Sequence, residues 1–223
     1  MTTNVDVVLP CLDEAEALPA VLRGLPTGFT ALVVDNGSTD DTAAVAREWG
    51  ARVVAEPRRG YGAAVHTGLE SATSELVAVL DADGSLDPAV LPTLVSLVLD
   101  GDADGRVDLA LGRRIAAGRH VQPWHARAGN AALAALLRRR GVPVHDIAPI
   151  RVGRRDRLLG LGVRDRALGY PLELLLRAAS DGWCLREVDI EYRPRAGGRS
   201  KVSGSVRGTL RAVRDMSMVA IRT

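Results

Sequence analysis

Short apolar runs alternate with amphipathic stretches along most of the chain. Runs of Val, Leu and Ala between polar residues are typical of strands buried on both faces of a sheet, and apolar residues three or four positions apart are typical of helices. The pattern predicts strands over 5–10, 30–34, 52–55, 76–80, 107–111 and 185–192. It predicts helices over 11–25, 42–49, 63–72, 89–99, 127–140 and 170–182. Alternation of this kind predicts an α/β fold, with a mostly parallel central sheet and helices on both faces.

The composition is that of a folded globular domain. Of 223 residues, 47% are apolar and 25% are charged, which excludes a disordered chain and fits one domain better than two. The two cysteines, Cys11 and Cys184, lie far apart, so neither a disulfide framework nor zinc-ligand spacing is indicated. The chain starts without a signal peptide, and no apolar run approaches the roughly 20 residues that cross a bilayer. The two distant cysteines fit a reducing compartment, and we expect a cytoplasmic protein with no nucleic-acid partner, while the net charge of +2 says little on its own.

The strand predicted over 76–80 is followed by Asp81-Ala82-Asp83-Gly84. Side chains alternate along a strand, so Asp81 and Asp83 are expected on the same side of its carboxyl end, where ligands bind in open α/β sheets. Two neighbouring carboxylates repel each other unless a cation lies between them or one is protonated, and a divalent cation shared with a diphosphate explains the pair. The alternative is a polar turn that caps the following helix.

A basic glycine loop, Arg58-Arg59-Gly60-Tyr61-Gly62, precedes the helix predicted over 63–72. A nicotinamide-dinucleotide fold is disfavoured, because its third small residue would fall at Val65 and its loop should directly follow the first strand. A nucleotidylyltransferase is disfavoured too, since the first strand is not followed by a glycine-rich loop with a basic residue. Backbone amides at the start of a helix can still bind an anion. The alternative is a connector with solvated charges.

Arginines are concentrated in the second half of the chain. Arg113 and Arg114 close a predicted strand, and the segment 193–201 combines arginines and glycines with Lys201, the only lysine. Such a loop either extends into solvent or binds phosphate, and the glycines favour a loop that closes over a ligand. From Val206 onward, apolar residues recur at helical spacing beside arginines. A basic amphipathic helix of this kind either lies on an anionic membrane surface or packs its apolar face on the core.

Taken in order, these motifs resemble a known enzyme family. The chain is similar to family 2 glycosyltransferases of the GT-A fold, in the branch of the dolichyl- or polyprenyl-phosphate mannose and glucose synthases. The resemblance is carried by residues 8–14, 33–40, 60–62 with Gly68, 81–83, 112–114, Arg127 with Asn130, 187–190 and 195–201. It implies a metal-dependent, inverting transfer of a hexose from a UDP- or GDP-linked donor to a polyprenyl phosphate. The expected organisation is a single GT-A domain over 1–223, with a nucleotide-sugar half (1–112), an acceptor half (113–202) and a C-terminal amphipathic helix (203–223).

The resemblance also implies roles for individual residues. The nucleotide-sugar site would comprise Pro10, Leu12, Glu14, Val33, Asp35, Gly60, Asp81, Ala82 and Asp83. Within it, Asp81 and Asp83 would hold Mg2+ or Mn2+ and, through the metal, the diphosphate. Acceptor phosphate would be bound by Arg114, Arg127, Arg195 and Lys201, and catalysis would involve Asp83, Arg127 and Asp146.

The acceptor decides whether a base is needed. A phosphate has a second pKa of about 6, so it is nucleophilic at neutral pH and needs positioning more than a base. A hydroxyl acceptor would need a carboxylate base, for which Asp146 and Glu173 are the candidates. The surplus of arginines favours a polyprenyl phosphate, reached by peripheral contact with the cytoplasmic membrane. Two alternatives are a soluble glycosyltransferase acting on a hydroxyl of a small metabolite or glycan, and a non-catalytic nucleotide-sugar-binding module, which the intact Asp81 and Asp83 disfavour.

Overall fold

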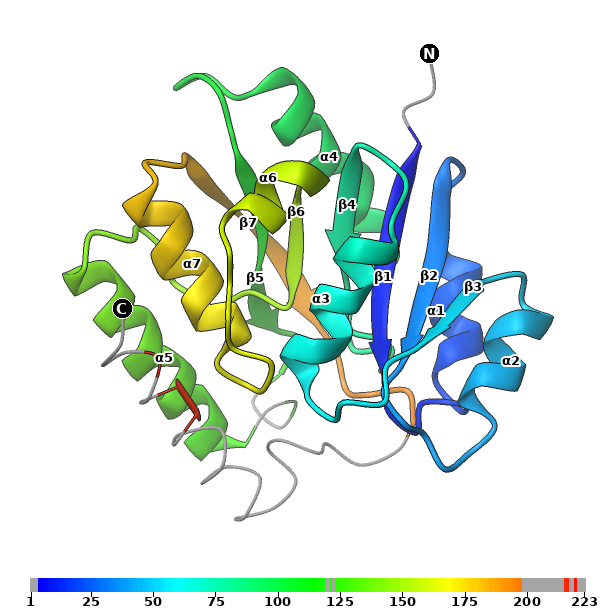
Figure 1. Ribbon diagram of the computed structural model, residues 1–223. Helices are drawn as coiled ribbons and strands as arrows, with labels where there is room; N and C mark the ends of the chain where they lie inside the picture. The colour runs from blue at the N-terminus through cyan, green and yellow to red at the C-terminus, as the bar shows by residue number, and fades with distance from the viewer. Residues whose placement is uncertain (1–3, 119–120, 122, 198–214, 217–218, 220–223) are drawn as a thin grey trace.

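The fold is centred on a seven-stranded sheet in the order β3-β2-β1-β4-β6-β5-β7 (Figure 1). The computed structural model of the chain describes residues 4–118, 121, 123–197, 215–216 and 219. Strands β1 to β4 are parallel, β6 runs antiparallel to both of its neighbours, and β5 and β7 are parallel to each other. The predicted α/β fold with a mostly parallel sheet is confirmed.

Strands and helices alternate in the first half of the chain, as predicted. The strands are β1 (Val5–Cys11), β2 (Phe29–Asp35), β3 (Arg52–Ala55) and β4 (Leu76–Val79). The helices are α1 (Leu18–Gly24), α2 (Thr42–Glu48), α3 (Tyr61–Ser71) and α4 (Leu91–Asp100), the last preceded by the 3-10 turn η1 (Pro88–Val90). The strand order reverses between β1 and β4, and in open α/β sheets such a point is where ligands bind.

The second half is less regular. It contains β5 (Leu109–Ala116), α5 (Trp124–Arg139), β6 (Ile150–Arg154), α6 (Arg155–Gly160), α7 (Tyr170–Ser180) and β7 (Leu185–Tyr192). The hydrophobic pattern does not predict β6 or α6, because β6 has five residues and two of them are arginines. The strand predicted to end at residue 111 continues as β5 to Ala116, where it pairs with β7 along its whole length.

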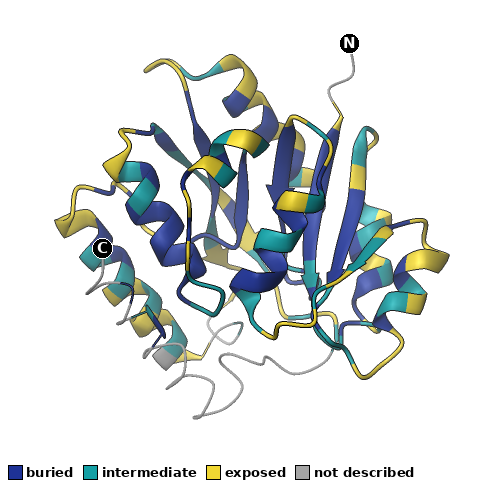
Figure 2. Cartoon of the chain, viewed as in Figure 1, coloured by how far each residue is buried: buried dark blue, intermediate teal, exposed yellow. Residues whose placement is uncertain are grey.

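Helices cover both faces of the sheet, with α3, α5, α6 and α7 on one face and α1, α2 and α4 on the other (Figure 1). The central strands are buried along their length between these layers (Figure 2). Alternate side chains of a strand point to opposite faces of the sheet. Val8 therefore packs on the side of α3, and Val7 and Leu9 pack on the side of α1 and α4. The contact with α3 depends on Gly68, where a Cβ atom would lie 2.2 Å from Cγ1 of Val8.

The helix predicted over 11–25 begins only at Leu18, so the predicted start is wrong. Asp13 has a φ of +52°. Its amide donates to Oγ of Ser38 (2.9 Å), and its Oδ1 accepts from the amide of Thr39 (2.7 Å). These bonds tie the loop after β1 to the loop after β2. Residues 12–17 therefore form a turn at the carboxyl edge of the sheet instead of the first turns of a helix.

The predicted C-terminal amphipathic helix over 203–223 lies outside the described residues, apart from 215–216 and 219, and so does Lys201. Among the residues that the structure describes, no helix is both long and apolar enough to cross a membrane. The two predicted halves of the chain share one sheet, because β6 of the second half pairs with β4 of the first. Their division into a donor half and an acceptor half stays a prediction.

Candidate active site

The paired aspartates follow β4 at the carboxyl edge of the sheet, next to β1. The amide of Leu80 donates to the carbonyl oxygen of Val8 at 3.0 Å, which extends the pairing of the two strands toward the motif. Asp81 is partly exposed, whereas Asp83 is 6% exposed. The two carboxylates follow the carboxyl end of a buried strand, as the sequence pattern predicts, and they lie at the point where the strand order reverses.

Both carboxylate oxygens of Asp83 are hydrogen-bonded. Its Oδ1 accepts from the amide (2.9 Å) and the hydroxyl (2.5 Å) of Ser85. Its Oδ2 accepts from Nη1 of Arg195 (2.5 Å), and Nη2 of Arg195 donates to Oε1 of Glu14 (2.6 Å). The segment after β7 is held against the motif, because the amide of Ala196 donates to the carbonyl oxygen of Asp83 (3.0 Å). Arg195 thus connects a predicted metal ligand to a residue of the predicted nucleoside pocket.

Asp81 contacts Tyr61, which is partly exposed and is paired with the buried Arg151. The hydroxyl of Tyr61 donates to Oδ1 of Asp81 at 3.5 Å and accepts from Nη1 of Arg151 at 3.1 Å. Arg151, on β6, is 2% exposed, and its Nη2 donates to the carbonyl oxygen of Ile147 at 3.1 Å. Burial raises the pKa of Asp81 to about 6, the charge of Asp83 adds to this, and the charge of Arg151 opposes it. Burial also raises the pKa of Tyr61 to about 12, so its hydroxyl is a donor at neutral pH.

The residues predicted to bind the nucleoside lie where β1 and β2 end. Pro10, Leu12 and Asp35 are partly exposed at this edge. Val33 and Ala82 are instead 0% and 2% exposed, within the core between the sheet and the helices α1, α2 and α4. Their side chains belong to the core and are not presented at this edge.

The glycine loop packs against the rest of the chain through its amides. The amide of Gly60 donates to Oδ1 of Asn36 at 2.8 Å. The amides of Gly62 and Ala63 donate at 3.0 and 2.9 Å to carbonyl oxygens of the loop before α7. A Cβ atom at Gly60 would lie 2.1 Å from the carbonyl oxygen of Arg166. These contacts favour the connector over an anion site made by these amides, and the glycines permit the close approach.

The predicted acceptor side is organised around Arg114 in β5. Its Nε and Nη2 form a bidentate ion pair with Asp146 at 2.9 and 2.6 Å, and its amide donates to Asp146 Oδ2 at 2.8 Å. Oδ1 of Asn130 accepts from Nη2 of Arg114 at 3.3 Å. Arg127, the other predicted phosphate ligand of this region, is exposed on α5.

The two carboxylates considered as a base are engaged elsewhere. Asp146 and Glu173 are 1% and 6% exposed. Glu173 accepts from the amides of Arg164 (3.1 Å) and Asp165 (2.7 Å) and from Nε of Arg177 (2.7 Å). Burial would raise both carboxyl pKa values, but the hydrogen bonds and the arginine charges outweigh it and lower the pKa of each. Both side chains are therefore ionised anions that hold arginines and amides, and neither is presented to an acceptor as a base.

Tyr61 and Ser85 contact the paired aspartates and Arg151 contacts Tyr61, although sequence reasoning gives them no such role. Arg151 carries a signal that could have identified it, because it interrupts an otherwise apolar run from Ile147 to Val152, and a charge inside a buried strand requires partners. Tyr61 and Ser85 carry none, since both residue types are common at helix starts and in loops.

The paired aspartates offer ligands that suit a hard divalent cation. Mg2+ and Mn2+ prefer carboxylate oxygens, and Mg2+ is commonly held by one or two carboxylates together with phosphate oxygens of the substrate. No cluster of three or more His, Cys, Asp or Glu side chains able to hold a metal occurs within the described part of the chain. Asp81 and Asp83 would hold the cation together with substrate and water oxygens, and Oδ2 of Asp83 would exchange Arg195 for the metal.

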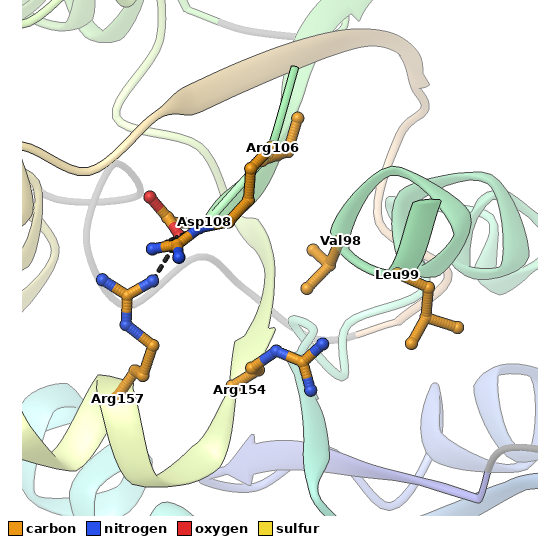
Figure 3. A pocket seen from close by; sticks show the side chains of 7 residues that line it. Val98, Leu99, Arg106, Asp108, Arg154 and Arg157 are labelled. Atoms are coloured by element: carbon orange, nitrogen blue, oxygen red, sulfur yellow. Dashed lines mark hydrogen bonds and ion pairs between the residues drawn. The ribbon is translucent and has the colours of Figure 1, made fainter. Parts of the chain in front are cut away.

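A cavity of about 280 Å³ lies at the opposite edge of the sheet (Figure 3). It is lined by Val98, Leu99, Arg106, Val107, Asp108, Arg154 and Arg157. Its arginines are already paired, Arg106 and Arg157 with Asp108, and Arg154 with Glu75. None of the described site residues lines this cavity, and its paired charges indicate a structural role.

Comparison with solved structures identifies the fold. The glucosyl-3-phosphoglycerate synthase of Mycobacterium tuberculosis, solved with Mn2+, UDP and glucosyl-3-phosphoglycerate, matches with a TM-score of 0.76 and 23% identity. The match covers 98% of this chain and 79% of that chain. This fold, with paired aspartates at the end of its central strand, is that of a GT-A glycosyltransferase.

Sequence comparisons identify the family. The sequence model described as glycosyl transferase family 2 matches residues 6–159. A glycosyltransferase of Mycobacterium tuberculosis is 58% identical over 213 residues, which cover 95% of each chain. The dolichyl-phosphate hexose transferase of Haloferax volcanii is 34% identical over 196 residues, which cover 86% of this chain and 83% of that protein. The chain belongs to glycosyl transferase family 2, which confirms the predicted family and enzyme class.

Proposed function

We propose that the chain transfers a hexose from a nucleoside diphosphate sugar to a polyprenyl phosphate, with Mg2+ or Mn2+ as cofactor. The observation that carries the proposal is an acceptor side in which Arg114 is oriented and both candidate carboxylate bases are already hydrogen-bonded. Both candidate bases, Asp146 and Glu173, are buried and hydrogen-bonded. A phosphate is already anionic at neutral pH, so it needs cationic donor groups and no base, whereas a hydroxyl acceptor needs a base.

The donor side fits a nucleoside diphosphate and a metal. Asp81 and Asp83 would hold the cation, which, when bound, neutralises charge on the departing nucleoside diphosphate. Pro10, Leu12 and Asp35 lie beside the pair at the ends of β1 and β2, where the nucleoside would bind. The structural neighbour from Mycobacterium tuberculosis was solved with Mn2+ and UDP, which supports the metal and a UDP-linked donor.

Two acceptor classes share the phosphate chemistry, a lipid phosphate and a phosphorylated small metabolite. The neighbour solved with glucosyl-3-phosphoglycerate supports the metabolite, and the relative named dolichyl-phosphate hexose transferase supports the lipid. Two exposed apolar side chains favour the lipid. Ile115 follows Arg114 in β5 and is 45% exposed, and Trp124, at the start of α5 shortly before Arg127, is 79% exposed. Exposed apolar side chains that neighbour predicted phosphate ligands along the chain suit contact with a prenyl chain.

Two measurements test the proposal. Thermal shifts with UDP- and GDP-hexoses, each with and without Mn2+, should show a metal-dependent rise in melting temperature with one nucleotide, because a ligand that binds only the folded state stabilises it. Transfer of labelled sugar from that donor should then occur to farnesyl phosphate, and neither to farnesol nor to 3-phosphoglycerate. Transfer to farnesol, or to 3-phosphoglycerate alone, contradicts the acceptor. The absence of any shift in folded protein contradicts the donor site.

A further inference from the structure

Arg114 is held by contacts from three other parts of the fold. Asp146, in the loop before β6, binds its Nε and Nη2 at 2.9 and 2.6 Å. Asn130 of α5 accepts from Nη2 at 3.3 Å, and the ring of Tyr192 of β7 has its centre 5.7 Å from the guanidinium carbon. Asp146 therefore fills one edge of the guanidinium, and the plane of the group is fixed on several sides.

The opposite end of the guanidinium is available to a ligand. An arginine offers five N–H donors in a rigid fork. Asp146 and Asn130 accept three of those of Arg114, and its Nη1 makes no hydrogen bond with any residue that the structure describes. The side chain is 18% exposed, and its strand β5 is separated by β6 alone from β4, the strand that leads to Asp81. The two N–H groups of Nη1 thus remain for a ligand.

The loop that carries Asp146 is itself held by a second carboxylate, Glu187 of β7. Glu187 accepts from the amides of His145 (2.9 Å) and Asp146 (3.0 Å), and it contacts Nδ1 of His145 at 2.9 Å. Its side chain is 11% exposed, and its backbone lies opposite Leu111 in the register of β5 and β7. Glu187 therefore holds the loop that carries Asp146, and Asp146 in turn holds Arg114.

We propose that Asp146 and Glu187 are positioning residues, which orient Arg114 so that its Nη1 binds the anionic acceptor beside Asp81 and Asp83. The inference rests on the proposed function in one respect, the anionic character of the acceptor. A bidentate pair fixes the plane of a guanidinium in a way that a single contact does not. Asp146 uses both carboxylate oxygens for this contact, so it acts through Arg114 and does not accept a proton from the acceptor.

The variant Asp146→Asn tests the first step. Asparagine keeps the size of the side chain but loses its charge and one acceptor oxygen, so the bidentate pair is lost. The probe is farnesyl phosphate without a donor, with binding followed by the 31P signal. We expect its Kd to rise by about 10- to 100-fold, the usual effect of losing hydrogen bonds to a charged group. Glu187→Gln should give a smaller loss in the same direction, and the Kd of the nucleotide sugar with Mn2+ should stay within about twofold in both variants.

Asp108 provides a matched control. It is 8% exposed, accepts from Nε of Arg106 at 2.7 Å and pairs with Arg157, but it lies at the other end of β5 (Figure 3). Asp108→Asn therefore removes the charge of a buried aspartate that pairs with arginines, without touching the site. It should lower the melting temperature and leave the Kd of farnesyl phosphate unchanged. Equal weakening by Asp108→Asn and Asp146→Asn would overturn the proposal.

A double variant separates positioning from proton transfer. Arg114→Lys keeps a cation beside Asp146 but loses the fork, so it should weaken farnesyl phosphate binding and still fold. Adding Asp146→Asn to it should cause no further loss, because Asp146 acts only through Arg114. If Asp146→Asn instead lowers turnover at saturating acceptor by about 10²- to 10⁴-fold in both backgrounds, with binding unchanged, Asp146 is a base and the proposal is wrong.

The experiments distinguish a failure of the positioning role from a failure of the proposed lipid acceptor. If the wild-type protein binds 3-phosphoglycerate or inorganic phosphate but not farnesyl phosphate, the lipid acceptor is wrong. The same variants, measured with the bound anion, then decide the positioning role. A wild-type protein that is folded by its thermal melt and binds none of the three anions overturns both proposals.

Discussion

Replacing Arg195 with methionine should make the protein bind Mn2+ more tightly, although it removes a residue of the proposed site. In the structure, the guanidinium of Arg195 lies between Asp83 and Glu14, at 2.5 and 2.6 Å. A dication that binds Oδ2 of Asp83 must first displace this cation. Arg195→Met leaves the carboxylates without their internal counter-charge, so a metal ion has no competitor.

The size of the effect follows from the contacts that are lost. The side chains of Arg195, Asp83 and Glu14 are 23%, 9% and 10% exposed, so the pairs are partly screened by solvent. A hydrogen bond to a charged group contributes about 1.5–3 kcal/mol. A tenfold change in affinity corresponds to about 1.4 kcal/mol. Loss of the contact with Asp83 should therefore lower the Kd of Mn2+ by roughly 10- to 100-fold.

The assay is a Mn2+ titration without nucleotide, in which the free ion is followed by electron paramagnetic resonance. Arg193→Met is the matched control, because Arg193 lies in the same segment but pairs with the exposed Glu191 (2.7 Å) and Asp87 (3.4 Å). The control should leave the Kd of Mn2+ within about twofold of the wild type. Sugar transfer should fall in Arg195→Met alone, because this arginine is proposed to bind acceptor phosphate after the metal displaces it.

The reasoning is refuted if Arg195→Met weakens Mn2+ binding or leaves it unchanged. Weaker binding would mean that Arg195 orders the carboxylates for the metal. Unchanged binding would mean that the metal does not use Oδ2 of Asp83, and the proposed ligand pair would then be wrong. Equal tightening by Arg193→Met would show that the effect reflects only the net charge of the segment.

Three further predictions concern stability and the acceptor. Burial raises the pKa of Asp81 from 3.8 to about 6. The free energy of unfolding should therefore fall by at most about 3 kcal/mol as the pH rises from about 4 to above 6. In urea unfolding, Asp81→Asn should be more stable than the wild type at pH 7.5, and the difference should vanish below about pH 4. Gly62→Ala places a Cβ atom 2.7 Å from Cβ of Tyr170 and should cost about 1–3 kcal/mol in urea unfolding, whereas Gly129→Ala, with no atom within 4 Å, should not destabilise. Trp124→Ser should weaken binding of farnesyl phosphate but not of inorganic phosphate, and an equal loss of both would contradict a prenyl contact.

Elements with their own periodic signal were predictable from the sequence. The bounds of β3 (Arg52–Ala55) and β7 (Leu185–Tyr192) match the prediction, and the position of Asp81 and Asp83 follows from the buried run before them. The start of α1 was not predictable, because it is decided by bonds between Asp13 and residues about 25 positions away. Acidic residues in a first helical turn gave a plausible local signal, and tertiary contacts outweighed it.

The roles of individual site residues were less predictable than their positions. The sequence suggests Asp146 as a candidate base. Its pairing with Arg114 could not be predicted, because the two residues are 32 positions apart. Arg195 reads as a phosphate ligand, but its contact with Glu14 spans 181 positions. A residue type gives the chemistry that a side chain can perform. Only the folded neighbourhood determines whether its hydrogen-bonding atoms are already used.

Strand β6, which is antiparallel to both of its neighbours, fixes the distance between β4 and β5. It lies between β4, which leads into Asp81, and β5, which carries Arg114, and it pairs with both. Hydrogen-bonded strands are about 4.8 Å apart, so β4 and β5 are separated by roughly 10 Å, a span fixed by backbone pairing and not by flexible loops. With the proposed sites at Asp81 and Arg114, the diphosphate and the acceptor anion would be kept from direct contact, with a gap that the transferred sugar would fill. Loop substitutions would change the affinity at either end, while the sheet preserves the length of the reaction path.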